Sequence, residues 1–488
     1  MKQSKKLKRL IALLGILIIV CCATVYVIKY EEKKEQIKNS EDIILEISSE
    51  TVTDLSWSNE TTSVSFHKNE NSWQYSEDEL FPVNEKKIGD LLELFEAFAV
   101  SFEIENVEDM SMYGLEDPVA IIQITTEDSI SYELRLGDFS TMDSKRYVSI
   151  GDGKVYLVSD DPLDMYNIGL SDMIRHDEDL DYEQITQISF EGAENYTVVY
   201  EEGSTHTYNT EDRYFTEYED TIVPLDTASV DAYLEILTAL NPTNYVNYKV
   251  TDDELTDYGM DEPELIVTVD YVYTDYEDVE KTVSDSFVIR VGRNQDTVKE
   301  VEASIQAAKE SGNDNFEAEA IPAYIRIGES GIIYEITESS YEALMRTSFN
   351  DLRHKEAFNG MFDNVKQLNI ALEGNEYILE SQVSEDDEEA TVWSYDENEI
   401  DISGIQSAIS NLTATDFTNE KVEDKEEISV ILHLDNEYFP TVEIHLYRYD
   451  GDSCLAVVDG KSFALIDRSN VVNLIEAVHS IVLNKSTE

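Results

Sequence analysis

Three aspartates at alternating positions are the residues of this chain whose spacing comes nearest to that of a metal site. Asp177, Asp179 and Asp181 stand at the spacing of the first three ligands in a calcium-binding EF-hand loop. Tyr182 then stands where that loop needs a glycine, and Ile188 where it needs a bidentate glutamate. The three aspartates are therefore weak candidates for metal ligands. The other interpretation is diffuse binding of cations by a strongly acidic surface.

A second candidate for cation binding is the motif YGLEDP at residues 113–118, which returns as YGMDEP at residues 258–263. Glycine can take the left-handed conformation that a sharp turn needs, and proline biases the residue before it toward extended geometry. The motif therefore predicts a structural turn that starts a strand, with its two acidic residues in solvent. The residues assigned to these turns are Tyr113, Gly114, Pro118, Tyr258, Gly259 and Pro263.

The sequence contains no familiar catalytic or nucleotide-binding motif. GDGK at residues 151–154 lies between two apolar runs, where Asp-Gly favours a tight hairpin turn. GESG at residues 328–331 places its serine one position too late for a hydrolase elbow. His176 and His354 each follow an arginine, which indicates a positively charged helix end. We therefore predict no cofactor and assign no catalytic residue.

The charge of the chain is strongly one-sided, with 35 Lys and Arg against 104 Asp and Glu and a net charge of −69. Such a chain should repel nucleic acid, because binding phosphates requires clustered Lys and Arg. Paired carboxylates that could cleave a glycosidic bond cannot be recognised here, since so many acidic residues form close pairs by chance.

The N-terminal segment predicts attachment to a membrane. Residues 1–9 are basic, residues 10–28 carry no charge, and residues 31–44 form a charged stalk. About 20 apolar residues cross the hydrocarbon as a helix, and the basic flank stays in the cytoplasm. We predict a single-pass anchor in the cell membrane with the bulk of the chain outside; the alternative is a cleaved signal peptide whose last residue is Ala23. One cysteine lies beyond this segment, which excludes an intramolecular disulfide there and suggests a bacterial protein.

A helical pattern of apolar residues recurs along the chain and reveals three copies of one unit. Asn84, Asp226 and Asp401 stand before the three patterns, at the position expected for a helix N-cap. The apolar residues of the pattern are Ile88, Leu91, Leu92, Phe95 and Phe98; Val230, Tyr233, Leu234, Leu237 and Leu240; and Ile405, Ala408, Ile409 and Leu412.

Strand-like segments precede and follow each helix, so we predict tandem modules at residues 45–176, 180–355 and 362–486, the third of them divergent. Residues 294–320 form a polar, partly helical insert in the second module. The predicted fold class is α+β: an N-terminal transmembrane helix, then strand-rich modules that each have a central amphipathic helix and a closing helix.

The ordered combination of these segments resembles the domain of unknown function 4340 family. The first two copies carry a starting strand (VTDLSW at 52–57, ITQISF at 185–190), the turn motif, and a closing MIRH or DLRH. The third copy lacks the turn and the proline before the helix. The resemblance implies a bacterial envelope protein anchored in the membrane and often encoded beside ABC-type transporter components. It implies no catalytic residues.

These observations favour a non-enzymatic extracytoplasmic protein that serves as an accessory or interaction component of the envelope, associated with an ABC-type transport system. One alternative is an envelope enzyme that acts on a wall or surface polymer through paired carboxylates. The other is a calcium-stabilised surface stalk. The expected partners are the membrane, through residues 10–28, and an envelope or transporter protein.

Overall fold

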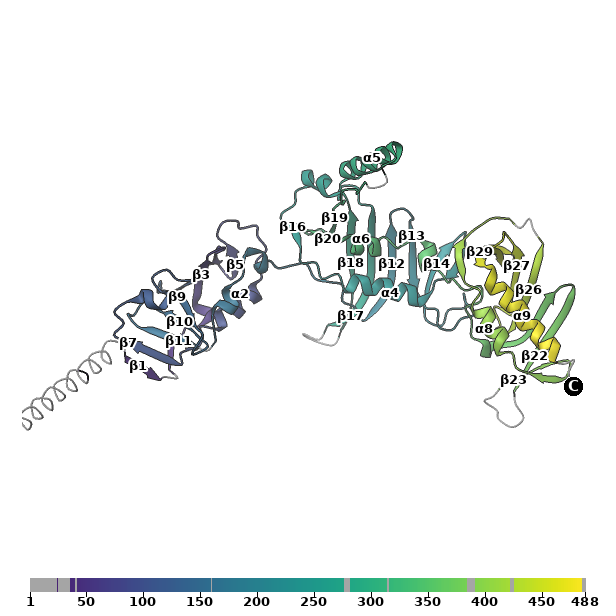
Figure 1. Ribbon diagram of the computed structural model, residues 1–488, viewed down its shortest axis with the longest axis horizontal. Coiled ribbons are helices and arrows are strands. Elements are labelled where there is room, and N and C mark those ends of the chain that lie inside the picture. The colour runs from purple at the N-terminus through teal and green to yellow at the C-terminus, as the bar shows by residue number, and fades with distance from the viewer. Residues whose placement is uncertain are drawn as a thin grey trace, which may run out of the picture. The chain divides into compact units, whose positions relative to one another are not determined.

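The computed structural model describes residue 24 and residues 36–39, 42–158, 160–275, 281–313, 316–383, 391–421 and 425–484. The chain divides into two compact units, residues 1–176 and residues 177–488. The first unit contains one nine-stranded sheet and one two-stranded sheet, and the second contains two nine-stranded sheets. Every strand pairing among the described residues is antiparallel. Figure 1 shows these sheets with many of their strands and helices labelled.

The large sheet of the first unit has the order β1-β7-β11-β10-β9-β8-β3-β4-β5. Its strands are β1 (Gln36–Asn39), β3 (Val52–Asn59), β4 (Ser63–Asn69), β5 (Ser72–Tyr75), β7 (Phe102–Glu105), β8 (Ala120–Thr126), β9 (Ser131–Ser140), β10 (Lys145–Ser149) and β11 (Val155–Val158). The small sheet pairs β2 (Ile43–Leu45) with β6 (Phe98–Ala99). The helices are η1 (Ser49–Thr51), α2 (Glu85–Glu93), η2 (Met110–Tyr113), α3 (Leu163–Tyr166) and η3 (Leu170–Met173).

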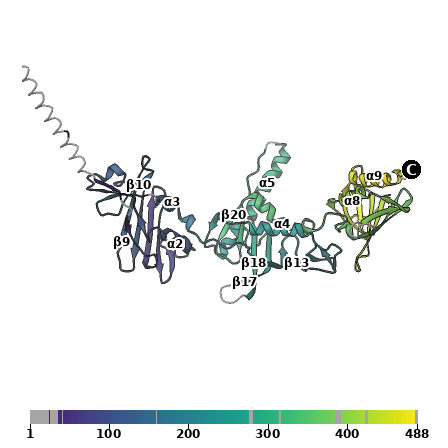
Figure 2. The same cartoon turned by 90° about the horizontal axis from the view of Figure 1, so that it is seen from below.

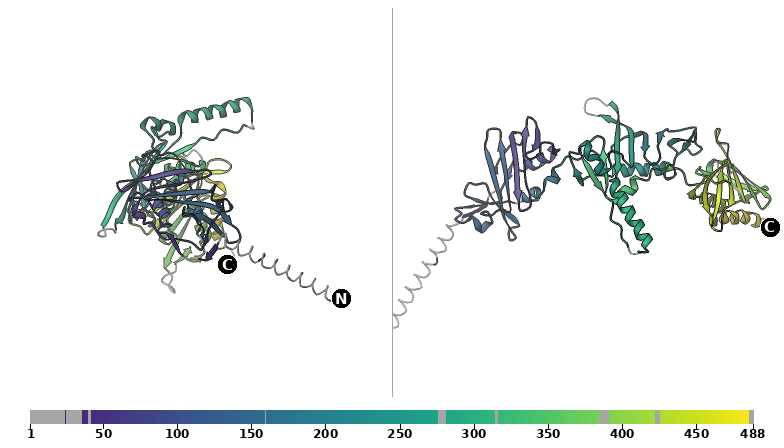
Figure 3. Two further views of the ribbon diagram at one scale, coloured as in Figure 1. Left: turned by 90° about the vertical axis from the view of Figure 1, so that its left-hand side faces the viewer. Right: turned by 90° about the horizontal axis from the view of Figure 1, so that it is seen from above.

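The second sheet has the order β15-β14-β13-β12-β17-β18-β19-β20-β16. Its strands are β12 (Gln184–Glu191), β13 (Tyr196–Tyr200), β14 (Tyr214–Tyr218), β15 (Thr221–Pro224), β16 (Tyr245–Asn247), β17 (Leu265–Asp275), β18 (Lys281–Gly292), β19 (Ala323–Ile327) and β20 (Ile333–Ile336). The helices are α4 (Thr227–Thr238), η4 (Asp252–Tyr258), α5 (Gln295–Ser311), α6 (Glu338–Leu344) and α7 (Phe349–Leu352). Figure 3 shows α5, which lies within the predicted insert, extending away from the strands of this sheet.

The third sheet has the order β24-β23-β22-β21-β26-β27-β28-β29-β25. Its strands are β21 (Val365–Leu372), β22 (Asn375–Val383), β23 (Thr391–Tyr395), β24 (Asn398–Ile400), β25 (Ala414–Phe417), β26 (Glu426–Leu434), β27 (Thr441–Arg448), β28 (Ser453–Val458) and β29 (Lys461–Asp467). The helices are η5 (Phe362–Asn364), α8 (Ser403–Ser410) and α9 (Arg468–Asn484). Figure 2 shows α8 and α9 on one side of this sheet.

The three large sheets share one order of eight strands. The run β7-β11-β10-β9-β8-β3-β4-β5 of the first sheet corresponds to β16-β20-β19-β18-β17-β12-β13-β14 in the second and to β25-β29-β28-β27-β26-β21-β22-β23 in the third. The register agrees as well, because the partners Trp57 and Ile122 match Phe190 and Val267, and Ile370 and Val430. Residues can therefore be compared between sheets by their position in the hydrogen-bonded ladder.

The central helices begin where the apolar pattern indicates, with one small difference. Asn84 and Asp226 are the N-caps of α2 and α4, and their side chains accept hydrogen bonds from backbone N–H groups, which confirms those two predictions. In the third copy, Ile402 is the N-cap and Asp401 stands one residue earlier, where its carboxylate accepts from the Ser403 N–H. The apolar face of each helix is buried in the core of its own sheet.

The predicted α+β fold class is wrong, because the described part of the chain is mostly β. Strands form the three large sheets, while several predicted helical stretches are short; α3 covers Leu163–Tyr166 and η3 covers Leu170–Met173. The helical pattern is easy to recognise but covers few residues, whereas the alternating pattern of half-buried strands is weaker and covers more of the chain. The prediction therefore gave the helices too much weight. Within the described residues, no helix is long and apolar enough to span a membrane. The predicted anchor at residues 10–28 lies outside the described residues, apart from Thr24.

The hairpin predicted at GDGK is present, because β10 and β11 pair antiparallel, but its turn is not the tight one expected. Positive φ angles occur at Gly151 and Gly153, and the strands end at Ser149 and begin again at Val155, so the connection is longer than a two-residue turn. The equivalent connection in the third sheet is the tight turn that Asp-Gly favours, with φ of 48° at Asp459 and 75° at the following glycine.

Each repeated turn motif lies with its backbone against a glycine of the neighbouring strand. Gly114 and Gly259 end η2 and η4 in the left-handed conformation, with φ of 69° and 68°. A Cβ atom on Gly137 would stand 2.1 Å from the Tyr113 carbonyl oxygen, and a Cβ atom on Gly292 would stand 2.3 Å from the Gly259 carbonyl oxygen. No side chain fits at either position, so the turn and the strand end require glycine at their contact.

Aromatic pairs hold the same turns to the sheet. Tyr113 packs edge-on against Tyr147 with ring centroids 4.9 Å apart, and Tyr258 packs against Tyr324 at 5.1 Å. The acidic residues between the glycine and Pro118 or Pro263 are exposed. The turns are thus anchored by backbone contact and aromatic packing, and their carboxylates face solvent.

Substitution of Gly137 by alanine should destabilise the first unit by about 2 kcal/mol, because the added methyl group overlaps the Tyr113 carbonyl and forces the turn off the strand. The matched control is Gly89→Ala in α2, where an added Cβ meets nothing within 4 Å. That control should stabilise the unit by about 0.7 kcal/mol, since alanine favours a helix interior.

The measurement is the urea dependence of amide hydrogen exchange in peptides from the first sheet of the full-length protein. Equal stability of the Gly137→Ala variant and the wild type would show that the close contact is not required.

Candidate functional site

The end of one strand and the closing helix meet at one corner of the second and third sheets, and this corner contains paired charges. In the second sheet, Glu264 precedes β17 and Arg293 follows β18. Arg293 donates from Nε and Nη2 to the two carboxylate oxygens of Glu264, both at 3.0 Å. The guanidinium and the carboxylate thus form a bidentate pair, which is the strongest geometry for these groups.

Two further side chains close this corner. The Tyr341 hydroxyl from α6 donates to Glu264 Oε2 at 2.7 Å, and Gln295 donates to Glu264 Oε1 at 3.1 Å. The Arg293 guanidinium also lies over the Tyr341 ring, 4.4 Å from its centroid. Burial by itself raises the pKa of Glu264, but the hydrogen bonds from Arg293 and Tyr341 together outweigh it and hold that pKa below its usual value of 4.5.

The same corner of the third sheet forms a pocket of about 860 Å³. The pair Leu265 and Val291 in the second sheet corresponds to the pair Ile428 and Leu446 in the third. Glu264 and Glu427 directly precede the first members of these pairs, and Arg293 and Arg448 follow the second members by two residues. Glu427 is therefore the equivalent of Glu264, and Arg448 is the equivalent of Arg293. The lining residues are Ala371, Leu372, Glu373, Gly374, Lys425, Glu426, Glu427, Arg448, Arg468 and Ile475.

The charged side chains of this pocket are only loosely joined. Arg448 Nε lies 3.8 Å from Glu427 Oε1, and Arg468 Nη2, from the first residue of α9, lies 3.4 Å from the same oxygen. The Cys454 thiol lies 3.8 Å from the other oxygen of Glu427, and burial raises the pKa of that thiol to about 11. Glu427 is therefore approached from three sides without any short hydrogen bond to a guanidinium.

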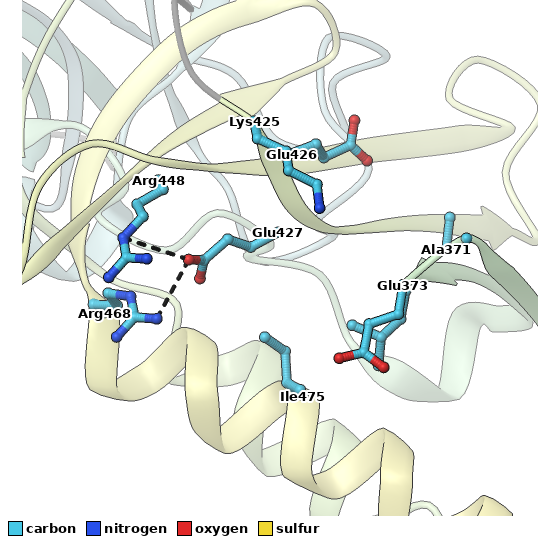
Figure 4. A pocket seen from close by; sticks show the side chains of 10 residues that line it. Ala371, Glu373, Lys425, Glu426, Glu427, Arg448, Arg468 and Ile475 are labelled. Carbon is cyan, nitrogen blue, oxygen red and sulfur yellow. Dashed lines mark hydrogen bonds and ion pairs between the residues drawn. The ribbon is translucent and has the colours of Figure 1, made fainter.

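Figure 4 shows how the charges are divided within the pocket. The Lys425 ammonium points into the space from the side opposite the two arginines, and the Glu426 carboxylate points away from the arginines. Glu426 Oε2 instead lies 3.5 Å from His445 Nδ1. Arg448 and Arg468 thus place two cationic groups at one end of the pocket, in a chain whose net charge is −69.

This arrangement is suited to binding and not to proton transfer. A general acid or base must be free to exchange a proton with a reacting group. Glu427 is the most buried carboxylate of the pocket, and two guanidinium groups stand between it and a reacting group in the pocket. Guanidinium and ammonium groups recognise carboxylate and phosphate oxygens, so the cationic end can hold an oxyanion.

The first sheet has a different and more deeply buried ion pair near its corner. Arg146 of β10 donates from Nε to both carboxylate oxygens of Asp161 at 2.7 Å and from Nη1 to the Gly137 carbonyl at 2.6 Å. The two side chains are 10% and 11% exposed. The pair ties the strand that carries Gly137 to the segment before α3.

The three aspartates that the sequence offers as weak candidates for metal ligands are not brought together. The Asp177 carboxylate accepts a hydrogen bond from the Tyr334 hydroxyl at 3.0 Å, while Asp181 is exposed. Asp179 is exposed too, although partial desolvation of its carboxyl group raises its pKa. Across the residues that the structure describes, no group of three or more His, Cys, Asp or Glu side chains is placed to hold a metal ion.

One histidine flagged by the sequence has a specific partner. His354 Nε2 lies 2.9 Å from Asp212 Oδ1, a carboxylate that also accepts hydrogen bonds from Thr207 and Asn209. The neighbouring Arg353 lies over the rings of Phe349, Phe417 and Phe463, and burial lowers its pKa. These contacts join the second and third sheets within the second unit, a structural role that differs from a free helix end.

The sequence analysis missed the corner residues Glu264, Arg293, Glu427, Arg448 and Arg468. They lie far apart along the chain and belong to no local motif. Basic residues are rare in this chain, so an alignment of the second and third copies by their strands could have drawn out the arginines that occupy equivalent positions.

Comparison with known protein families identifies the family of one part of the chain. The sequence profile described as "Domain of unknown function (DUF4340)" matches residues 73–263. These residues belong to that family. The DUF4340 match begins in β5 of the first sheet and ends at the proline of the second turn motif, so it includes both close-contact turns. No curated protein and no solved structure matches the chain.

Removal of the Tyr341 hydroxyl tests the closed corner within the DUF4340-containing chain. Tyr341→Phe should cost about 1.5 kcal/mol at pH 7, because a hydrogen bond to an ionised carboxylate is lost. The pKa of folded Glu264 is depressed, so this contribution is present above pH 4.5 and is lost as the pH falls through the folded pKa. The cost should therefore be smaller at pH 3.

Urea unfolding of wild type and variant at pH 7 and pH 3, followed by hydrogen exchange in peptides of β17 and β18, measures this difference. Tyr438→Phe, at an exposed tyrosine, is the matched control and should change stability at neither pH. A cost for Tyr341→Phe that is the same at both pH values would contradict the assigned role of Glu264.

Proposed function

We propose that this protein is a non-enzymatic, extracytoplasmic interaction component of the bacterial cell envelope, attached to the cell membrane through residues 10–28. The basic residues 1–9 and the uncharged residues after them support the orientation with the N-terminus in the cytoplasm. The acidic remainder of the chain is then outside the cell, where it attracts cations diffusely.

The observation that carries the proposal is the repetition of one antiparallel sheet three times in the same strand order. Repetition of a module multiplies similar surfaces along a chain, which is the way that repeat proteins build extended binding surfaces. Each sheet also carries a distinct set of charges at or near its corner, so the surfaces are related without being identical.

The corner geometry supports binding over catalysis by paired carboxylates. In the second sheet the carboxylate is saturated by Arg293, Tyr341 and Gln295, and in the third it faces two arginines. A glycosidase-like mechanism instead needs two facing carboxyl groups of which one holds a proton. An association with an ABC-type transport system rests on the family resemblance alone and is part of the proposal on that basis.

Crosslinking in intact cells tests the proposal. We expect a membrane-impermeant crosslinker, followed by gentle solubilisation and isolation of the full-length protein, to recover an envelope protein or a transporter subunit. The control is residues 1–44 fused to an unrelated acidic domain, which keeps the membrane segment and removes the three sheets.

Recovery of the same proteins with the control as with the full chain, or of no envelope protein at all, would contradict the proposal. Absence of crosslinking by an impermeant reagent, when a permeant reagent succeeds, would contradict the extracytoplasmic placement.

A further inference from the structure

The equivalent corners of the second and third sheets differ in how completely their charges are satisfied. In the second sheet, Glu264 receives two guanidinium hydrogen bonds at 3.0 Å, one from the Tyr341 hydroxyl and one from Gln295. Little of the hydrogen-bonding capacity of this carboxylate is left for a ligand. This corner is a closed structural element.

In the third sheet, the hydrogen-bonding capacity of the guanidinium groups is only partly used. Arg448 and Arg468 approach one oxygen of Glu427 at 3.8 Å and 3.4 Å, both longer than a good charge-assisted hydrogen bond. The Arg468 Nε atom is buried and has no hydrogen-bond partner among the described residues. A buried donor without a partner is costly, so an acceptor supplied from outside would stabilise this corner.

The space beside these donors is large enough for a small molecule. The pocket has a volume of about 860 Å³, within the range of roughly 300–1,000 Å³ that small-molecule sites occupy. The Lys425 ammonium points into it, and the apolar side chain of Ile475 from α9 forms part of its wall. A cationic end and an apolar wall together select a ligand that has an acidic head and a non-polar body.

We propose that this pocket binds a small molecule through a carboxylate or phosphate group held between Arg448 and Arg468. Glu427 occupies part of the space between the arginines as an internal substitute for the ligand's oxyanion. The second-sheet corner is the closed counterpart, in which side chains of the protein fill every position. The inference is independent of the envelope function proposed above.

The net charge of the chain makes such a site unusual. At a net charge of −69 the protein repels dissolved anions at long range, so an anion is held only where cations gather locally. At about 0.15 M salt the Debye length is roughly 8 Å, which screens this repulsion while leaving contacts inside the pocket effective. Binding should therefore be measured at that ionic strength.

The test uses the full-length protein in mild detergent, with glutarate as the carboxylate probe and glycerol phosphate as the phosphate probe, followed by isothermal titration calorimetry. We expect saturable binding of at least one probe. Arg448→Gln and Arg468→Gln should each weaken it roughly tenfold, because each removes a charge-assisted hydrogen bond. Arg135→Gln is the matched control, since Arg135 forms an exposed pair with Glu133 in the first unit and should leave affinity unchanged.

Glu427→Gln gives the most specific result. Loss of the internal carboxylate should tighten binding roughly tenfold, because the arginines no longer share their charge with it. A variant that fails to fold cannot bind more tightly, so the Glu427→Gln experiment still tests the proposal if an arginine variant is unstable. Binding of one probe alone would support the proposal and identify the acidic group. No saturable binding of either probe, or weaker binding by Glu427→Gln, would overturn it.

Discussion

The close contact between a left-handed turn and the end of a neighbouring strand is the constraint on which the rest of the first two sheets depends. Gly114 and Gly137 in the first sheet, and Gly259 and Gly292 in the second, bring backbone atoms together where no Cβ atom would fit. The contact fixes where the strand after the turn begins. It thereby aligns the corner at which the strand end meets the closing helix.

The third sheet shows what happens when this contact is absent. Strand register places Tyr447 where the second sheet has Gly292, and the copy has no YG turn to pack there. The Glu427 and Arg448 positions keep the charges of Glu264 and Arg293, yet their pairing is looser and the corner opens into the pocket. One scaffold thus supports a closed structural corner and an open charged one, and the difference follows from a few side chains.

Local patterns in the sequence predicted the parts of the fold that depend on local physics. The caps Asn84 and Asp226 and the left-handed glycines follow from rules that act within a few residues. The dominance of strands and the pocket around Glu427 depend on which distant strands pair, and rules that act within a few residues do not predict that pairing. Asp177, Asp179 and Asp181 show that a local pattern can also mislead. Their spacing imitates that of a metal site, but the fold does not bring their carboxylates together.

A double-mutant cycle between Gly259 and Gly292 tests the central claim most directly, since each substitution by alanine should break the same backbone contact. The free energy of unfolding of the second unit would be measured for both single variants and for the double variant. The account predicts that the double variant loses less stability than the sum of the singles, by at least about 1 kcal/mol. Additive losses would show that the two glycines act independently and would contradict it.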